Sequence, residues 1–191
     1  KEVTAYWDPA NGADTNDGLT ESAPVKTVEA AYAAFSGADK GNIVLLSTAT
    51  FTADTTFPTC EIPVTITAKN SAHGFSTGNH VFFGGDTVLD NMTLTLTKTS
   101  NAIYFSGEGH DLTIGANITT VSTDGSSRFC LSTHKTAGDN GSATLTVMAG
   151  SWRNIFVGGH TGENTGNATL NMSGGNVNNL VGPTFSGKLT G

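Results

Sequence analysis

Residues 141–150 read GSATLTVMAG, and residues 166–175, which lie 25 positions further along the chain, read GNATLNMSGG. In both copies apolar residues alternate with Thr or Asn, which is the pattern of a β-strand with one buried face. Repetition at about 20 to 30 residues is typical of a solenoid, in which each coil adds a strand to each of several sheets. The two segments therefore predict stacked β-coils.

A second series of short apolar segments repeats at a similar spacing. Its members begin at Val81, Ile103, Phe129, Ile155 and Leu180, so that each step is again about 20 to 30 residues. An antiparallel sandwich would instead show turn signals about every 8 to 12 residues. We therefore predict an all-β fold, a parallel β-helix of about six to seven coils.

One amphipathic helix is predicted, over Pro24–Phe35, because apolar residues recur there at helical spacing and proline is favoured at the first helical position. We expect this helix to cap the first coil, with Trp7 packed beneath it. The N-terminal part, residues 1–41, then holds a strand, a turn-rich loop and the helix. Residues 42–191 form the coils of the same single domain.

Composition excludes two classes of function. Nine Lys and Arg residues against 16 Asp and Glu give a net charge of −7, which is the wrong sign for binding phosphate backbones. The longest apolar runs are far too short to span a bilayer. We therefore expect no nucleic-acid partner and no membrane partner, and a monomer.

The ends and the cysteines support further expectations. The chain starts at Lys1 with no leader after it, so we interpret it as part of a longer secreted protein whose signal peptide has been removed. Residues 186–191 offer no cap comparable to the predicted helix. Cys60 and Cys130 are either two buried thiols or a disulfide, and spacing does not decide between these alternatives.

Residues 6–20, YWDPANGADTNDGLT, followed by PVKTVEAA at residues 24–31, resemble the opening of right-handed parallel β-helix proteins of the pectate-lyase-like superfamily. That resemblance implies a right-handed coil and a secreted bacterial protein that acts on or binds polysaccharide. The coil at residues 166–175 resembles proteins of gut bacteria. Together with the low charge, it is similar to the β-helical xylan-binding carbohydrate-binding modules of gut-bacterial xylanases.

This resemblance implies a non-catalytic module of an extracellular enzyme. Its ligand would be plant cell-wall polysaccharide, with xylan favoured, and its partner a covalently linked catalytic domain. Two alternatives stay open: a polysaccharide lyase or hydrolase of the pectate-lyase-like type, and a β-helical surface adhesin or spacer without glycan specificity.

The residues themselves argue against catalysis. A lyase of this type needs a cation cluster and an Arg or Lys base, but the only arginines, Arg128 and Arg153, fall one register apart. A β-helical hydrolase would need aspartates on neighbouring strands, and no Asp-Asp pair occurs. No Ser-His-Asp arrangement follows from the spacing. We therefore expect no enzyme and no required cofactor.

Alternation in the second series predicts a glycan-binding face. It places Phe82, Tyr104 and Phe156 outward, and it aligns a column of polar residues beside them. The candidate ligand-binding residues are Phe82, Tyr104, Phe156, Trp152, Asp86, Glu108, His134 and His160. Neighbouring coils lie about 4.8 Å apart, which is close to the length of one sugar in an extended glycan. A register shifted by one residue would instead turn the three aromatic rings into the core.

Two other assignments also have alternatives. Trp152 lies at a corner, where it is either an exposed platform for a sugar or a wedge between coils. His134 and His160 stand next to carboxylates, and such a group could instead hold a transition metal.

The turn-rich loop contains several oxygen-bearing side chains. Asp8, Asp14, Asn16 and Asp17, with Asn11 beside them, are of the type that binds structural calcium. The spacing does not match a helix-loop-helix calcium site, and Asp and Asn also form turns capped by their own side chains. Calcium and capped turns are the two alternatives.

Overall fold

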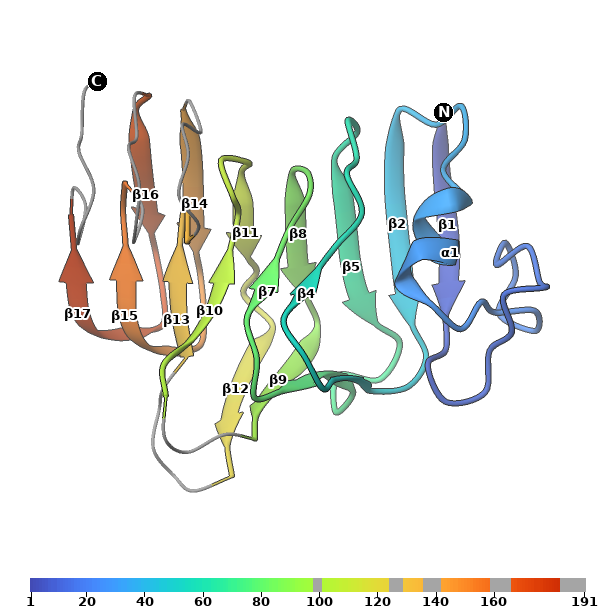
Figure 1. Ribbon diagram of the computed structural model, residues 1–191, viewed down its shortest axis with the longest axis horizontal. Helices are drawn as coiled ribbons and strands as arrows, with labels where there is room; N and C mark the ends of the chain where they lie inside the picture. The colour runs from blue at the N-terminus through green and yellow to red at the C-terminus, as the bar shows by residue number, and fades with distance from the viewer. Residues whose placement is uncertain (98–100, 124–128, 136–141, 159–165, 183–191) are drawn as a thin grey trace.

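The computed structural model describes residues 1–97, 101–123, 129–135, 142–158 and 166–182. This part of the chain winds into a parallel β-solenoid of about five turns with almost no helix (Figure 1). The predicted all-β fold is confirmed.

Three parallel sheets form the walls of the solenoid. The seven-stranded sheet contains, in spatial order, β1 (Glu2–Trp7), β2 (Lys40–Leu45), β5 (Val64–Ala68), β8 (Thr87–Asp90), β11 (Leu112–Ile114), β14 (Ala143–Val147) and β16 (Ala168–Met172). The six-stranded sheet contains β4 (Thr55–Thr56), β7 (Val81–Phe82), β10 (Ile103–Ser106), β13 (Phe129–Ser132), β15 (Ser151–Phe156) and β17 (Asn176–Val181). The four-stranded sheet contains β3 (Ala49–Phe51), β6 (Gly74–Thr77), β9 (Met92–Leu96) and β12 (Ile118–Ser122).

The strands form where the sequence alternates. In β5, β9 and β14 every apolar residue is buried and every Thr between them is only half-buried. Parallel pairing then places like residues on top of one another, as when Leu112, Leu145 and Leu170 follow in register. Each strand therefore has one face in the core and one face outside.

The predicted number of coils was too high, because two turns consume more chain than the period of the repeat. In the first of them Glu2 pairs with Lys40, and in the second Leu112 pairs with Leu145. Both steps include an insertion beyond the ordinary coil. The step from β14 to β16, which places Leu170 on Leu145, keeps the predicted period.

A line of aromatic rings runs through the core. Trp7 contacts Phe57, with a distance of 6.4 Å between ring centroids, and the line continues through Phe83 and Phe105 to Phe129. All five rings are at most 3% exposed. Edge-on and tilted contacts of this kind add to the free energy gained by burial.

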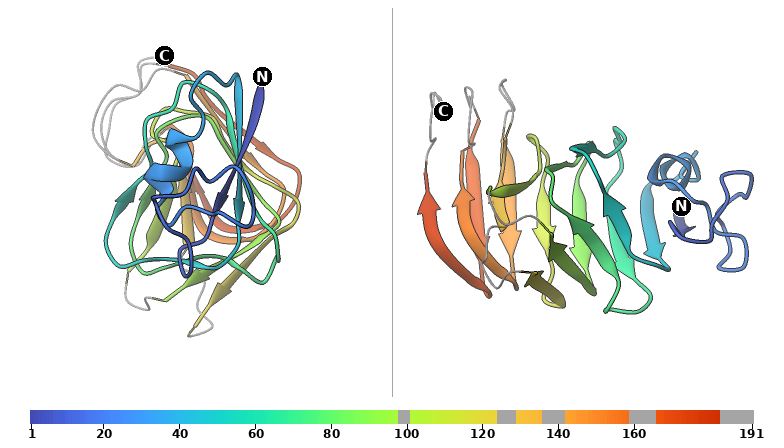
Figure 2. Two further views of the ribbon diagram at one scale, coloured as in Figure 1. Left: turned by 90° about the vertical axis from the view of Figure 1, so that its right-hand side faces the viewer. Right: turned by 60° about the horizontal axis from the view of Figure 1, so that its bottom comes forward.

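The helix is shorter than predicted. Only Val28–Ala33 (α1) is helical, because Val25 bridges to Trp7 at the end of β1 and Thr27 is extended. Thr27 is the N-cap, and its side chain accepts a hydrogen bond from the Ala30 N–H. Figure 2, viewed from the N-terminal end, shows α1 and the N-terminal loop crossing that end of the solenoid. No helix in the described ranges is long and apolar enough to cross a membrane.

Trp7 and the cysteines have defined environments. Trp7 is 3% exposed, and its indole N–H donates to the Lys26 carbonyl just before the helix, so it packs beneath the cap as predicted. Cys60 and Cys130 are thiols that are not joined in a disulfide, which agrees with the two-thiol alternative.

Candidate functional site

The predicted aromatic residues lie on the outer face of the six-stranded sheet, but not in the predicted column. Tyr104 pairs with Cys130, as expected from the repeat. Phe82 instead pairs with Ser106, and Phe156 pairs with Ser132, each shifted by two positions from the predicted partner. An even shift keeps a side chain on the same face of a strand, so the outward direction was right and the alignment was wrong.

The prediction that these rings are exposed was also wrong for two of the three. Phe82 is half-buried, whereas Tyr104 and Phe156 are 6% and 3% exposed. Their centroids lie 5.6 Å apart, and with Cys130 they form a second hydrophobic cluster outside the main core. Burial and the neighbouring Cys130 raise the pKa of the Tyr104 hydroxyl, so it stays protonated at neutral pH. Tyr104 and Phe156 therefore pack against each other and present little surface on which a ligand could stack.

Trp152 is a wedge in the core and not a platform. It is 1% exposed, its indole N–H donates to the Ala149 carbonyl, and its ring lies 6.0 Å from that of Phe129. The chain can fold over it because Gly150 has φ +87°, and a Cβ at that glycine would come 2.9 Å from the indole nitrogen. Trp152 is therefore not available to stack on a ligand.

The predicted polar column is only partly present. Glu108 and His134 are neighbours, with 3.5 Å between Glu108 Oε2 and His134 Nδ1. Asp86 is elsewhere: its carboxylate accepts a hydrogen bond from the Asp111 N–H at the start of the seven-stranded sheet. His160 lies outside the described residues.

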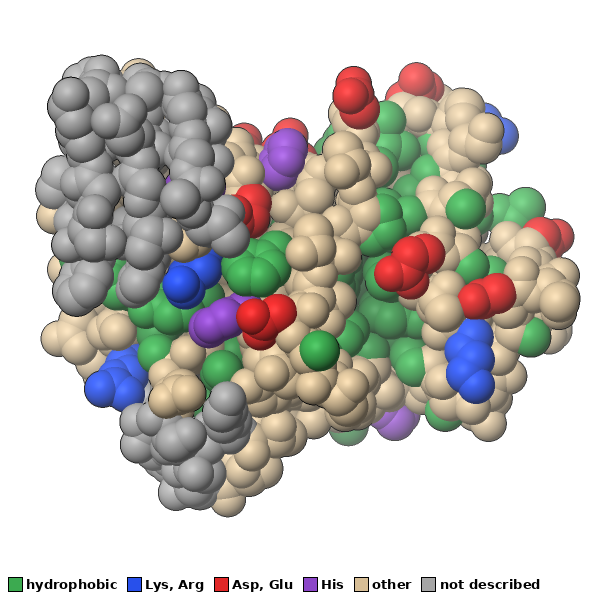
Figure 3. Space-filling model, in the orientation of Figure 1, with side chains coloured by type: hydrophobic (Ala, Val, Ile, Leu, Met, Phe, Trp, Pro, Cys, Tyr) green, Lys and Arg blue, Asp and Glu red, His purple; other side chains and the backbone are tan. Residues whose placement is uncertain are grey.

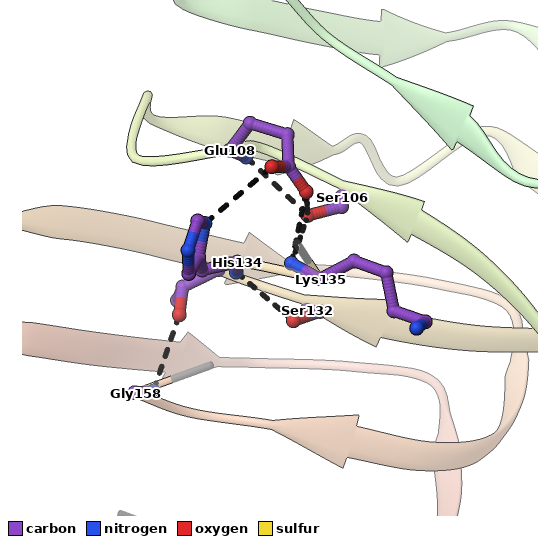
Figure 4. A network of polar contacts seen from close by, with 7 residues as sticks. Ser106, Glu108, Ser132, His134, Lys135 and Gly158 are labelled. Carbon is purple, nitrogen blue, oxygen red and sulfur yellow. Dashed lines mark hydrogen bonds and ion pairs between the residues drawn. The ribbon is translucent and has the colours of Figure 1, made fainter. Parts of the chain in front are cut away.

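Glu108 is held by a dense set of hydrogen bonds (Figure 4). The Ser106 hydroxyl donates to Glu108 Oε1 at 2.7 Å, and the Lys135 N–H donates to the same oxygen at 2.8 Å. The Glu108 N–H in turn donates to Ser106 Oγ. The backbone of Glu108 has φ +49°, a conformation that residues other than glycine adopt only when their surroundings enforce it.

His134 is the unusual member of this group. It is 3% exposed, and both of its ring nitrogens are buried with no hydrogen-bond partner among the described residues. Its backbone N–H donates to Ser132 Oγ, so a hydrogen bond fixes the backbone. Within the described ranges, the polar contact of the ring is the one with Glu108, at 3.5 Å. Such a group costs free energy relative to a hydrogen-bonded one.

The arrangement differs from a Ser-His-carboxylate triad. A catalytic serine donates to the histidine, which a carboxylate orients, but here Ser106 donates to the carboxylate and is fully buried. No three His, Cys, Asp or Glu side chains of the described residues come together in a way that could hold a metal ion. The group is best described as a polar support beneath the outer face.

Beside this face, a groove of about 570 Å³ lies at the N-terminal ends of β4, β7 and β10, the strand ends opposite to Glu108 and His134. Its polar lining comes from three turns and consists of Thr52, Asp54, Asn79, His80 and Asn101. In Figure 3 histidine, carboxylate and hydrophobic side chains meet near the middle of this face.

His80 connects the groove to the aromatic cluster. Its ring lies 5.4 Å from that of Tyr104 and 6.1 Å from that of Phe82, measured between centroids. Its ring Nδ1 accepts a hydrogen bond from the Tyr104 backbone N–H, and the His80 backbone N–H donates to Asp54 Oδ1. With Nδ1 occupied as an acceptor, the neutral ring carries its proton on Nε2. The groove thus combines amide, carboxylate and imidazole groups with an aromatic margin.

These groove residues were missed at the level of sequence. Asp54 and His80 are separated by one period of the repeat, so the spacing that aligned the aromatic residues would also have aligned them. They were missed because each lies in a loop beside a two-residue strand, where alternation gives no signal.

The oxygen-rich N-terminal loop binds its own backbone. The Asp14 carboxylate accepts hydrogen bonds from the Lys26 and Thr27 N–H groups and from the Thr27 hydroxyl, just before α1. Partial burial raises the pKa of Asp14, but these hydrogen bonds outweigh it and hold the pKa below its ordinary value. Asp14 therefore secures the cap.

The other loop side chains do the same. Asp8 accepts from the Asn11 N–H and from the Ser47 hydroxyl, and the Asn16 amide donates to the Pro24 carbonyl. Asp17 accepts a hydrogen bond from the Leu19 N–H. The structure therefore gives each predicted calcium ligand a role in a turn, and calcium binding stays a prediction.

No family model matches this chain, and neither a curated protein nor a solved structure matches it.

Proposed function

We propose that this chain is a non-catalytic polysaccharide-binding module, with xylan as the favoured ligand. The observation that carries the proposal is the open groove around His80, with polar groups along its walls and aromatic rings beside it. The partly exposed Phe82 is the ring of the predicted set that best retains a binding role.

The chemistry of the groove suits hydroxyl groups. Amides of Asn79 and Asn101 both donate and accept, the Asp54 carboxylate accepts, and the His80 imidazole lines the same groove. A sugar offers donors and acceptors at similar spacing, while its C–H face packs on an aromatic ring. Successive turns about 4.8 Å apart present such groups at intervals close to one sugar.

Charge favours a neutral glycan. The net charge is −7 and the groove contains a carboxylate, so an acidic polysaccharide such as pectin would be repelled. The preference for xylan over other neutral glycans rests on the resemblance to xylanase modules. The same resemblance carries the proposals of a bacterial extracellular location and of an attached catalytic domain, which the module would hold near insoluble substrate.

Affinity electrophoresis tests the proposal. The purified chain is run in gels that contain xylan, β-glucan, mannan or pectin, and product release is assayed in parallel. We expect retardation by xylan without products. Asn101→Ala, an exposed position of the groove, should weaken the retardation, whereas Thr65→Ala on the outside of the seven-stranded sheet should not.

Other outcomes are informative. Release of oligosaccharides by the chain would replace the proposal with a lyase or hydrolase. Equal retardation of both variants would show that the binding site lies outside the groove. No retardation in any gel would favour the spacer or adhesin.

A further inference from the structure

The groove around His80 receives polar side chains from three successive turns of the solenoid. Thr52 and Asp54 precede β4, Asn79 and His80 precede β7, and Asn101 precedes β10. The three strands lie side by side, with β7 paired to β4 on one side and to β10 on the other (Figure 1). Each turn therefore adds its own polar groups to the groove at intervals of about 4.8 Å along the solenoid axis.

Hydrogen bonds within the chain hold the groove side chains of the first two turns. Asp54 Oδ1 accepts the His80 backbone N–H at 2.9 Å, and the His80 ring Nδ1 accepts the Tyr104 backbone N–H at 3.1 Å. The Asn79 side-chain amide donates to the Phe51 carbonyl at 3.2 Å. Side chains fixed in this way lose little further freedom when a ligand binds, so these two turns are preorganised.

The described residues limit the length of the groove along the axis. Towards the N-terminus, β4 is the first of the described strands in the six-stranded sheet. Towards the C-terminus, Ile103 and Tyr104 of the third turn pair with Phe129 and Cys130, which are 1% and 0% exposed. The described part of the following turn therefore adds no accessible side chain at this position, and the groove extends over three turns.

Three turns match a segment of three sugars. Two steps between turns add up to about 10 Å, which is close to the separation of the first and third sugars in an extended glycan. The groove volume of about 570 Å³ falls within the range of about 300–1,000 Å³ that is typical of sites for small ligands.

We infer that the groove has three sugar subsites, one for each turn, and binds a neutral segment of three sugars that runs along the solenoid axis. This inference rests on the proposed function and specifies the length and direction of its ligand. Thr52 and Asp54 form the first subsite, Asn79 and His80 the second, and Asn101 the third.

Calorimetric titration with oligosaccharides of increasing length tests the inference. The probes are xylobiose, xylotriose, xylotetraose and xylohexaose. We expect the affinity to rise by about tenfold from xylobiose to xylotriose, because the third sugar fills the last subsite. From xylotriose to xylohexaose it should rise by no more than about fourfold, because the longer chain only offers more overlapping segments of three sugars.

Variants at the two ends of the groove locate the subsites. Thr52 and Asn101 are both exposed, so their replacement should leave the fold intact. Thr52→Ala and Asn101→Ala should each weaken binding of xylotriose by at least about threefold and of xylobiose by less than about twofold. The shorter ligand is spared because it still finds two complete subsites. Thr65→Ala, on the outside of the seven-stranded sheet, is the control and should change neither affinity.

Several results would overturn this inference and leave the proposed function in place. Equal affinity for xylobiose and xylotriose would show a shorter site, and a steep rise from xylotriose to xylohexaose would show a longer one. Retardation by xylan without binding of any of the four oligosaccharides would also contradict it. If neither xylan nor the oligosaccharides bind, the proposed function fails as well.

The same titrations test the direction of the ligand. If Thr52→Ala and Asn101→Ala weaken xylobiose as much as xylotriose, the ligand does not run from turn to turn and the assignment of the subsites is wrong.

Discussion

The two ends of the solenoid follow the same stacking rule but are closed differently. At the N-terminal end α1 buries Val28 and Ala31, and Trp7 beneath it is 3% exposed. At the other end Leu180 stands 59% exposed at a position that is fully buried one turn earlier. The apolar pattern of a strand therefore does not by itself bury a residue. Burial depends on what is stacked above, which is why solenoids need capping elements.

The largest effect is expected deep in the capped half. Phe75 is 0% exposed, and its ring lies 5.7 Å from Phe57 and 6.1 Å from Trp7. Phe75→Ala should lower the free energy of unfolding by about 3–5 kcal/mol, through lost burial and the cavity left behind. Urea unfolding followed by circular dichroism measures it, with Phe75→Leu as the milder control. A loss below about 1 kcal/mol would mean that the packing of Phe75 on Phe57 and Trp7 does not stabilise this half.

A matched pair of variants in the C-terminal half tests this difference in burial most directly. Ile155 and Leu180 occupy the same register position in adjacent turns. Ile155→Ala should cost about 2–5 kcal/mol, whereas Leu180→Ala should stay within about 0.5 kcal/mol, as for an exposed position. Amide exchange should also be faster in β17 than in β15, since weakly covered segments open first. Equal costs for the two variants would show that Leu180 is covered in solution.

A smaller effect is expected from the hydrogen bonds that secure the cap. Asp14→Ala should destabilise the chain by about 1 kcal/mol, a typical value for losing such a cap on an exposed surface. The pKa of Asp14 is lowered in the folded chain from 3.8. Its stabilisation is therefore present above about pH 3.8 and is lost as the pH falls through the folded-state pKa.

This pH dependence separates Asp14 from the other carboxylates. Thermal unfolding of the wild type and of Asp14→Asn is compared between about pH 5 and pH 2.5, on both sides of the carboxyl pKa. The difference in Tm should shrink towards the acid end, because Asp14 of the wild type becomes protonated there. Asp8, whose pKa is also lowered, is present in both proteins, so its contribution cancels. A constant difference would show that the Asp14 charge has no part in securing the cap.

The smallest effect is expected at His134, which lies between the two ends. Its ring nitrogens make no hydrogen bonds with the part of the chain that the structure describes, so His134→Leu should change the free energy of unfolding by less than about 1 kcal/mol and can be stabilising. Ser106→Ala is the matched change within the same network, because it removes the hydroxyl that donates to Glu108 Oε1 and accepts from the Glu108 N–H, and should cost about 1–3 kcal/mol. A large loss in His134→Leu would reveal a partner for the ring.

Residues on the outer face show how far a periodic sequence can be interpreted. Phe82 and Phe156 were predicted to point outward and do so, but their strand partners are Ser106 and Ser132. Side-chain direction depends only on parity along a strand, so it survives a shift of two positions. Alignment across turns depends on the lengths of the loops between strands, which vary from turn to turn. In the predicted polar column, Glu108 and His134 are neighbours as expected, and Asp86 departs from the column for this reason.

The sequence by itself determined that this chain is a β-solenoid, because alternation and a period of about 25 residues are local properties that any stacked turn must satisfy. It also predicted that a helix covers the N-terminal end and that Trp7 packs beneath it. Only the tertiary structure decided that Trp152 is in the core, that Tyr104 is covered, and that the groove forms around His80. Exposure and site geometry arise from contacts between turns, and these depend on loop lengths and on neighbouring turns that no single segment encodes.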